Sequence, residues 1–125
     1  MGEDVFAEDT FTISARHVDA DVVLVAIAGE LDVETVPRVA AFLAETTAIT
    51  PRHLVLDLSE VTFLTSSGIG LLITAQTVDN GINGQLHLIG VADNRAVHQP
   101  LAQVGLLGQF DVAPDLDTLR TRLSS

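Results

Sequence analysis

The middle of the chain contains the run His53-Leu54-Val55-Leu56-Asp57-Leu58, and a helical pattern follows it after Thr65-Ser66-Ser67-Gly68. The run is nearly all apolar, which is typical of a strand covered on both faces of a sheet. The later pattern has helical spacing and ends at a typical C-terminal stop; it consists of Ile69, Leu72, Ile73, Gln76, Val78 and the stop Asn80-Gly81. A buried strand that leads through a short turn into a helix predicts an α/β fold with parallel strands.

Strands and a helix are also expected on the N-terminal side of this unit. Apolar and polar residues alternate over residues 10–18, which predicts a half-buried edge strand. The segment from Val22 to Ala28 predicts a second, buried strand, and Asp19-Ala20-Asp21 joins the two as an antiparallel hairpin. After Gly29-Glu30-Leu31-Asp32, apolar residues recur at helical spacing from Val36 to Thr47. Residues 1–9 are polar and patternless, which predicts a flexible N-terminal arm.

The C-terminal side adds a buried strand from Gln85 to Gly90 and two helices. Asp93-Asn94 can cap the first of these helices, and Pro100 inside it predicts a kink or a split. Phe110-Asp111-Val112 is a candidate last strand before a helix that carries Leu116, Leu119 and Leu123. We therefore predict one compact α/β domain over residues 10–125, with a mixed sheet of four to five strands, an N-terminal antiparallel hairpin and about four helices.

The composition excludes several classes of function. The chain has 17 acidic and 6 basic residues, a net charge of −11, so nucleic-acid phosphates and anionic membrane surfaces would repel it. Its apolar stretches are far shorter than the about 20 residues that a membrane-spanning helix needs. The N-terminus is acidic, unlike the basic start of a signal peptide. We expect a cytoplasmic protein that binds neither nucleic acid nor membrane; its acidity favours a basic partner surface or serves solubility alone.

The residues predict no enzyme, no metal site and no cofactor. Gly68-Ile69-Gly70 lacks the third glycine of a dinucleotide fingerprint, and Ser66 lacks the hydrolase elbow. The chain has neither the Lys of a phosphate-binding loop nor any Cys. The four histidines lack metal-ligand spacing and are interpreted as surface or hydrogen-bonded residues; they are His17, His53, His87 and His98. Asp32 and Asp57 both follow buried strands and form either a carboxylate pair or local caps.

A hydroxyl cluster, Thr65-Ser66-Ser67, lies before the central helix. One hydroxyl is enough to cap a helix. Three of them, followed by Gly68 and Gly70, predict an exposed surface that a partner can approach closely. A phosphate here would be stabilised by free helix amides and the helix dipole, so it should act on a bound partner and leave the domain folded.

Three segments carry a family resemblance: Gly29-Glu30-Leu31-Asp32, Leu54 to Gly70, and Val104-Gly105-Leu106. In this order and spacing they resemble the STAS domain, and among its members a bacterial anti-sigma factor antagonist. The resemblance implies a regulator that binds an anti-sigma factor, often a serine kinase of the histidine-kinase-like ATPase fold, and thereby frees a sigma factor. It further implies that the kinase ends this interaction by phosphorylating Ser66, and that a phosphatase reverses the modification.

The hydroxyl cluster and the resemblance together indicate a partner-binding surface formed by Glu30, Asp32, Thr65, Ser66, Ser67, Gly68 and Gly70. Thr65 stands where the family usually has Asp, so Thr65 and Ser67 are alternative phosphorylation sites to Ser66. Three functions stay open at this point. They are a phosphorylation-controlled antagonist, a non-switching STAS scaffold or assembly module, and a small-ligand or nucleotide-binding domain.

Overall fold

The computed structural model describes residues 4–8, 11–47, 52–81 and 85–124. In chain order, its elements are β1 (Asp4–Glu8), β2 (Phe11–Asp19), β3 (Val22–Leu31), α1 (Val36–Thr47), β4 (His53–Leu64), α2 (Ser66–Gly81), β5 (Gln85–Ile89), α3 (Arg95–Gln103), the 3-10 turn η1 (Leu107–Gln109), β6 (Asp111–Ala113) and α4 (Leu116–Leu123). This order is the predicted one with one strand added at the start.

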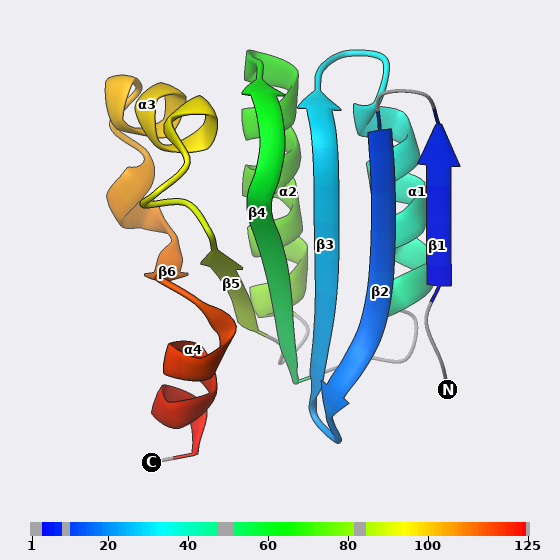
Figure 1. Cartoon of the computed structure of the whole chain (residues 1–125), viewed down its shortest axis with the longest axis vertical. Coiled ribbons are helices and arrows are strands. Elements are labelled where there is room, and N and C mark those ends of the chain that lie inside the picture. The colour runs from blue at the N-terminus through cyan, green and yellow to red at the C-terminus, as the bar shows by residue number, and fades with distance from the viewer. Residues whose placement is uncertain (1–3, 9–10, 48–51, 82–84, 125) are drawn as a thin grey trace.

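The strands of the described residues form one mixed sheet in the order β1-β2-β3-β4-β5-β6 (Figure 1). β1, β2 and β3 pair antiparallel, whereas β3 to β6 pair parallel. The α/β class, the mixed sheet and the N-terminal hairpin are thereby confirmed, as are the four α-helices found within the described ranges. The sheet is 6-stranded over these residues, one strand more than the upper prediction.

The additional strand corrects the prediction of a flexible arm for residues 4–8, whereas residues 1–3 and 9 of that prediction lie outside the described residues. Residues 4–8 form β1 at the edge of the sheet, where Val5 lies opposite Ser14 and Phe6 opposite Ile13. Strand pairing is made by backbone groups, so an edge strand can form without the alternation of side chains that marks a half-buried strand. Val5 is 64% exposed, which agrees with an edge strand that buries little.

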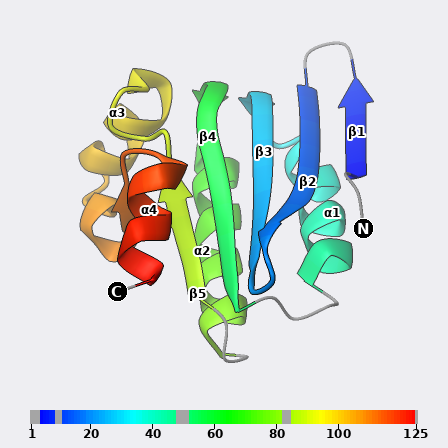
Figure 2. The same cartoon turned by 60° about the horizontal axis from the view of Figure 1, so that its bottom comes forward.

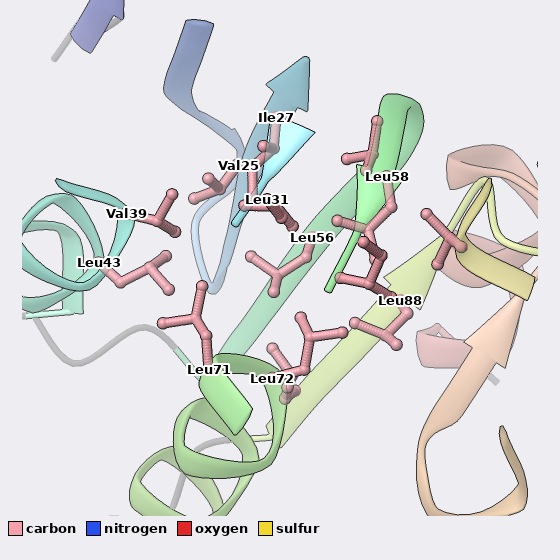
Figure 3. Close-up of a cluster of buried hydrophobic side chains, with 14 of the residues drawn as sticks. Val25, Ile27, Leu31, Val39, Leu43, Leu56, Leu58, Leu71, Leu72 and Leu88 are labelled. Carbon is pink, nitrogen blue, oxygen red and sulfur yellow. The ribbon is translucent and has the colours of Figure 1, made fainter. Parts of the chain in front are cut away.

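Helices α1, α2 and α3 pack on one face of the sheet, and α4 packs on part of the other face (Figure 2). The main core lies between the sheet and the first three helices. Figure 3 shows leucine and valine side chains from α1 and α2 pointing toward those of β3, β4 and β5; they include Val39, Leu43, Leu71, Leu72, Val25, Leu56 and Leu88.

Strand β4 lies at the centre of this arrangement and is covered on both faces. Leu54, Leu56 and Leu58 point into the main core, whereas Val55 packs in a second cluster under α4. This double burial is the reason why the run from His53 to Leu58 shows no polar alternation.

Helix α3 begins as predicted and is not split. Asn94 caps it, since its Oδ1 accepts a hydrogen bond from the Ala96 N–H at 3.1 Å. The helix then continues through Pro100 to Gln103. We expected a kink or a split at Pro100, and the split does not occur, because this nine-residue helix tolerates the loss of one backbone donor.

The Val104-Gly105-Leu106 segment forms the C-terminal cap of α3. The Gly105 N–H donates to the Ala102 carbonyl at 3.1 Å, and the Leu106 N–H donates to the Leu101 carbonyl at 2.9 Å. These two bonds define a Schellman motif. Leu106 then packs against the main core, which fixes the chain direction after the helix.

Candidate functional site

The carboxyl ends of β3 and β4 bring the two segments of the predicted site together. Leu31 pairs with Leu64 at the last position of both strands. The backbone N–H and the hydroxyl of Thr65 each donate to the Leu31 carbonyl, both at 3.0 Å. Hydrogen bonds from Thr65 therefore join the hydroxyl cluster directly to the segment that contains Glu30 and Asp32.

The three hydroxyl side chains differ in exposure. Ser66 is exposed, whereas Thr65 and Ser67 are half-buried. The Thr65 hydroxyl is also engaged by the Leu31 carbonyl. Ser66 is the first residue of α2, so Ser66 and Ser67 lie within the helix, whereas we predicted that the whole cluster precedes it. The most accessible hydroxyl of the cluster thus lies in the first turn of the helix.

The amides around Ser66 lie at the amino end of α2. The first bond along the helix runs from the Ile69 N–H to the Thr65 carbonyl at 3.0 Å. The N–H groups of Ser66, Ser67 and Gly68 precede this bond and have no acceptor within the helix. Their partial positive charge favours an anion beside the Ser66 side chain.

Gly68 and Gly70 have different places in this site. Gly68 is buried, and a Cβ added to it would lie 2.6 Å from the Leu64 Cδ1 and 2.9 Å from the Leu31 carbonyl oxygen. Gly70 is exposed, and a Cβ added there meets nothing within 4 Å. Gly68 therefore positions α2 against the end of β3, and Gly70 belongs to the surface.

Glu30 is placed by a bulge near the end of β3. Gly29 has a φ of 108°, and the pairing with β4 shifts register between Gly29 and Glu30. A positive φ is readily adopted only by glycine, and a bulge redirects the side chain that follows it. The Glu30 side chain is exposed at this point, in register with Phe63.

Asp32 and Thr35 cap the start of α1 reciprocally. The Asp32 Oδ1 accepts hydrogen bonds from the N–H groups of Thr35 at 3.0 Å and Glu34 at 2.9 Å. The Thr35 hydroxyl accepts from the Asp32 N–H at 3.0 Å and donates to the Glu30 carbonyl at 2.7 Å. The hydrogen bond from the Thr35 N–H is the main cause that lowers the pKa of Asp32, so this carboxyl group stays ionised.

Asp57 does not pair with Asp32. It lies opposite Ala26 in the sheet, and its Oδ1 accepts a hydrogen bond from the Ser59 N–H at 3.0 Å. Asp32 is six residues beyond Ala26, which corresponds to about 20 Å along a strand. Of the two roles that the sequence left open, bonding to local amides is therefore the correct one for both carboxylates, but Asp57 lies within β4 and not after a strand as predicted.

The sequence analysis missed two exposed apolar side chains at this edge of the sheet. Val33 is 72% exposed and follows Asp32 directly, and Phe63 is 54% exposed opposite Glu30. The sequence does contain a signal for them, because each is an apolar residue at the point where the chain leaves a buried strand. Exposed large apolar side chains beside a polar rim are typical of a protein–protein contact.

The site offers a free hydroxyl, helix amides, carboxylates and two apolar side chains. Within the described ranges, no group of three or more His, Asp or Glu side chains has the arrangement of a metal site. The same part of the chain has no helix with the length and apolar character needed to cross a membrane. The arrangement is suited to contact with a protein and to accepting a phosphoryl group on Ser66.

Residues 13–119 match the family model of the STAS domain, and the chain belongs to this family. It is 32% identical over 69 residues to the anti-sigma-B factor antagonist of Staphylococcus aureus (strain NCTC 8325 / PS 47). That match covers 55% of this chain and 64% of the relative, so it spans less than two thirds of the curated protein.

Solved structures of the same fold extend over nearly the whole chain. An anti-sigma factor antagonist from Mycobacterium paratuberculosis is 28% identical with a TM-score of 0.81, over 95% of this chain and 98% of that one. The Bacillus cell fate determinant SpoIIAA in its phosphorylated form is 17% identical with a TM-score of 0.65, over 87% and 97%. The second likeness concerns the fold alone. The predicted STAS fold is confirmed.

Proposed function

We propose that this chain is an anti-sigma factor antagonist that is switched off by phosphorylation of Ser66. In the unphosphorylated state it binds an anti-sigma factor of the serine kinase type in the cytoplasm, and a sigma factor is released. The observation that carries the proposal is the exposed Ser66 hydroxyl at the amino end of α2, bonded through Thr65 to the end of β3. The antagonists of S. aureus and M. paratuberculosis support the class of partner.

The proposed contact surface combines acidic and apolar groups. Glu30 and the ionised Asp32 form its acidic part, and Val33 and Phe63 form its apolar part. Charged groups at an interface act mainly on the association rate and on the choice of partner, whereas buried apolar side chains contribute most of the affinity. The anti-sigma factor is thus expected to present basic side chains around an apolar pocket.

Phosphorylation would change this surface without unfolding the domain. A phosphoserine at residue 66 adds about −1.5 to −2 charges and three acceptor oxygens. The amides of Ser67 and Gly68 and the helix dipole favour that charge within this chain. An apolar partner pocket shaped for a neutral hydroxyl would have to accommodate the added bulk and remove water from the phosphate, and both effects weaken binding.

Ser66 is preferred over its two neighbours because of what each hydroxyl contacts. The Thr65 hydroxyl donates to the Leu31 carbonyl and is half-buried. Ser67 is half-buried as well, whereas Ser66 is exposed. A kinase active site needs to reach the hydroxyl oxygen in line with the γ-phosphate, which favours the most exposed of the three. The same exposure would let a phosphatase remove the phosphate from Ser66 and restore the form that binds the anti-sigma factor.

The modification is tested with an anti-sigma factor kinase of this type and ATP, followed by mass spectrometry of the chain. Phosphate is expected on Ser66 and is expected to disappear in Ser66→Ala. Phosphate found only outside residues 65–67 would exclude the proposed switch.

The switch itself is tested by measuring the affinity for the same anti-sigma factor. Ser66→Asp is expected to weaken binding by about 30-fold or more, which corresponds to about 2 kcal/mol. Ser66→Ala should bind within about threefold of the unmodified chain. Gln85→Glu, which adds the same charge at the start of β5, is the matched control and should be neutral. Equal binding by Ser66→Asp would instead favour the non-switching scaffold.

A further inference from the structure

Two histidines, which no sequence pattern places together, form one hydrogen-bonded chain with an aspartate. The His53 Nδ1 lies 3.0 Å from the His87 Nε2. The other ring nitrogen of His87, Nδ1, contacts the Asp111 Oδ2. His87 is 1% exposed, so each of its nitrogens is satisfied by one of these two partners. We name Asp111, His87 and His53 the histidine relay.

The relay lies on the face of the sheet that α4 covers. Leu86 and Leu88 point into the main core, so His87 between them points to the opposite face. Its neighbours there, Val55 and Ile89, pack with Leu119 of α4. His53 lines an open cavity of about 500 Å³ whose wall also contains Arg120, Leu123 and Ser124 of α4. Solvent therefore reaches the relay at the edge of α4.

The direction of the hydrogen bonds follows from the carboxylate. Asp111 can only accept, so the His87 Nδ1 carries a hydrogen and the His87 Nε2 is left as an acceptor. The His53 Nδ1 must then donate to the His87 Nε2, and the lone pair of the His53 Nε2 remains for solvent. This assignment satisfies every nitrogen of the buried ring.

The two imidazole rings of the relay can take up one proton but not two. A first proton on the His53 Nε2 leaves both internal hydrogen bonds in place. On the rings, a second proton has only the His87 Nε2 left to occupy, and there it faces the N–H of His53 across 3.0 Å. Two donors and two positive charges cannot share that distance, so the two rings have to separate.

The charged groups around the relay come from each element that packs on it. Asp21 in the β2–β3 turn favours a proton on His53, whereas Arg52 opposes it. Asp111 of β6 contacts the His87 Nδ1. On α4, Arg120 is already paired with Asp19 at 3.0 Å, and an Arg122 amino group donates to the Val112 carbonyl at 3.3 Å. None of these groups removes the conflict between the two facing N–H groups.

We propose that the histidine relay is a proton-sensitive latch, which holds α4 on the sheet at neutral pH and releases it when both imidazoles are protonated. His87 lies on the face of the sheet where Leu119 of α4 packs against Val55 and Ile89, and α4 is a helix of 8 residues. Short helices with few buried residues are the first elements to open locally. The Arg120–Asp19 pair, which joins α4 to the β2–β3 hairpin, opens with it.

The direction of the pH effect follows from burial. Burial lowers the pKa of His53; the charges of His87 and Arg52 act in the same direction, and Asp21 acts against them. Protons therefore bind better to the opened state than to the closed one. The closed state keeps its full stability above pH about 6.5, the ordinary pKa of histidine, and loses it as the pH falls through the lower pKa of the folded chain.

The full chain labelled with ¹⁵N provides the first test, in which imidazole spectra are recorded from pH 8 to pH 4.5. Both His53 and His87 are expected to carry their hydrogen on Nδ1 at pH 7.5 and to titrate as a coupled pair. The amide shifts of residues 116–123 should follow the second step of this titration. Independent titration of the two rings, or α4 signals that do not move with them, would overturn the latch.

Hydrogen exchange on variants provides the second test. Protection of the α4 amides, corrected for intrinsic exchange rates, is expected to fall about tenfold or more between pH 7.5 and pH 5. In His53→Asn the side-chain amide can still donate to His87 but takes up no proton, so the loss should shrink to within about twofold. His98→Asn on α3 is the matched control and should behave as the unmodified chain. An undiminished pH effect in His53→Asn would overturn the proposal.

Discussion

Gly68 and Gly70 lie two residues apart in α2, yet only one of them has room for a side chain. A Cβ at residue 68 would overlap the Leu31 carbonyl and the Leu64 side chain, and a Cβ at residue 70 would point into open space. In an exposed helical position, alanine is more favourable than glycine by about 0.5–1 kcal/mol. The two glycines therefore respond in opposite ways to the same substitution.

Gly68→Ala is expected to lower the free energy of unfolding by about 1–3 kcal/mol, because the Leu31 carbonyl belongs to a paired strand and cannot move away easily. Gly70→Ala is expected to raise it by about 0.5–1 kcal/mol. Urea unfolding of both variants, with unchanged slopes, measures the two effects. A Gly68→Ala variant as stable as the unmodified chain would contradict the close contact between α2 and β3.

At the same scale, the position of Ser66 could be predicted, but the contacts of its neighbours could not. Ser and Thr are favoured at the start of a helix whatever the fold. That the Thr65 hydroxyl donates to Leu31, 34 residues away in sequence, depends on the pairing of β3 with β4. The same holds for His53 and His87, which come together only when β4 and β5 pair.

Among the elements, the link between β4 and α3 depends on one side chain. The Asn94 Nδ2 donates to the carbonyls of Leu58 and Val61, both at 2.8 Å, while its Oδ1 caps α3. These carbonyls flank the part of β4 where the pairing with β3 shifts register, opposite Ala26 and Ala28. The pairing of β4 with β5 ends at Asp57 and Ile89, so Asn94 supplies donors to β4 carbonyls beyond that point.

Asn94→Asp separates the two roles of this residue, because aspartate keeps the cap but replaces the donors with a second acceptor. We expect Asn94→Ala to cost about 2–4 kcal/mol of unfolding free energy, from one lost cap and two unsatisfied carbonyls. Asn94→Asp should cost at least as much, since a carboxylate would face two carbonyl oxygens. Thermal and urea unfolding decide this: an Asn94→Asp variant close to the unmodified chain would mean that only the cap matters.

The elements with strong periodicity were predicted well, and the exceptions have physical causes. α1, α4 and the central strands have burial patterns that their sequences display directly. β1 was missed because it is an edge strand held by backbone bonds to β2. The split expected at Pro100 does not occur, because α3 is a short helix in which one missing donor is tolerated.

For the whole molecule, the fold class and the location of the candidate site could be predicted from the sequence, but the histidine relay could not. Parallel strands joined by helices place their carboxyl ends at one edge of the sheet. This topology predicts that the segments around Asp32 and Ser66 lie next to each other there. The histidine relay lies beneath α4, on the other face of the sheet from α1 to α3. Nothing in the spacing of residues 53, 87 and 111 indicates that contact.

The net charge of −11 makes its own contribution to stability across the molecule. Self-repulsion destabilises the compact state, and salt screens it as the Debye length falls from about 30 Å at 0.01 M to about 8 Å at 0.15 M. The free energy of unfolding at pH 7.5 is therefore expected to rise by about 0.5–1 kcal/mol over this range. Two exposed residues give matched variants: Glu45→Gln should stabilise the chain and flatten its salt dependence, and Arg16→Gln should do the reverse. Shifts of the same sign in both variants would show that local contacts, rather than the net charge, control the response.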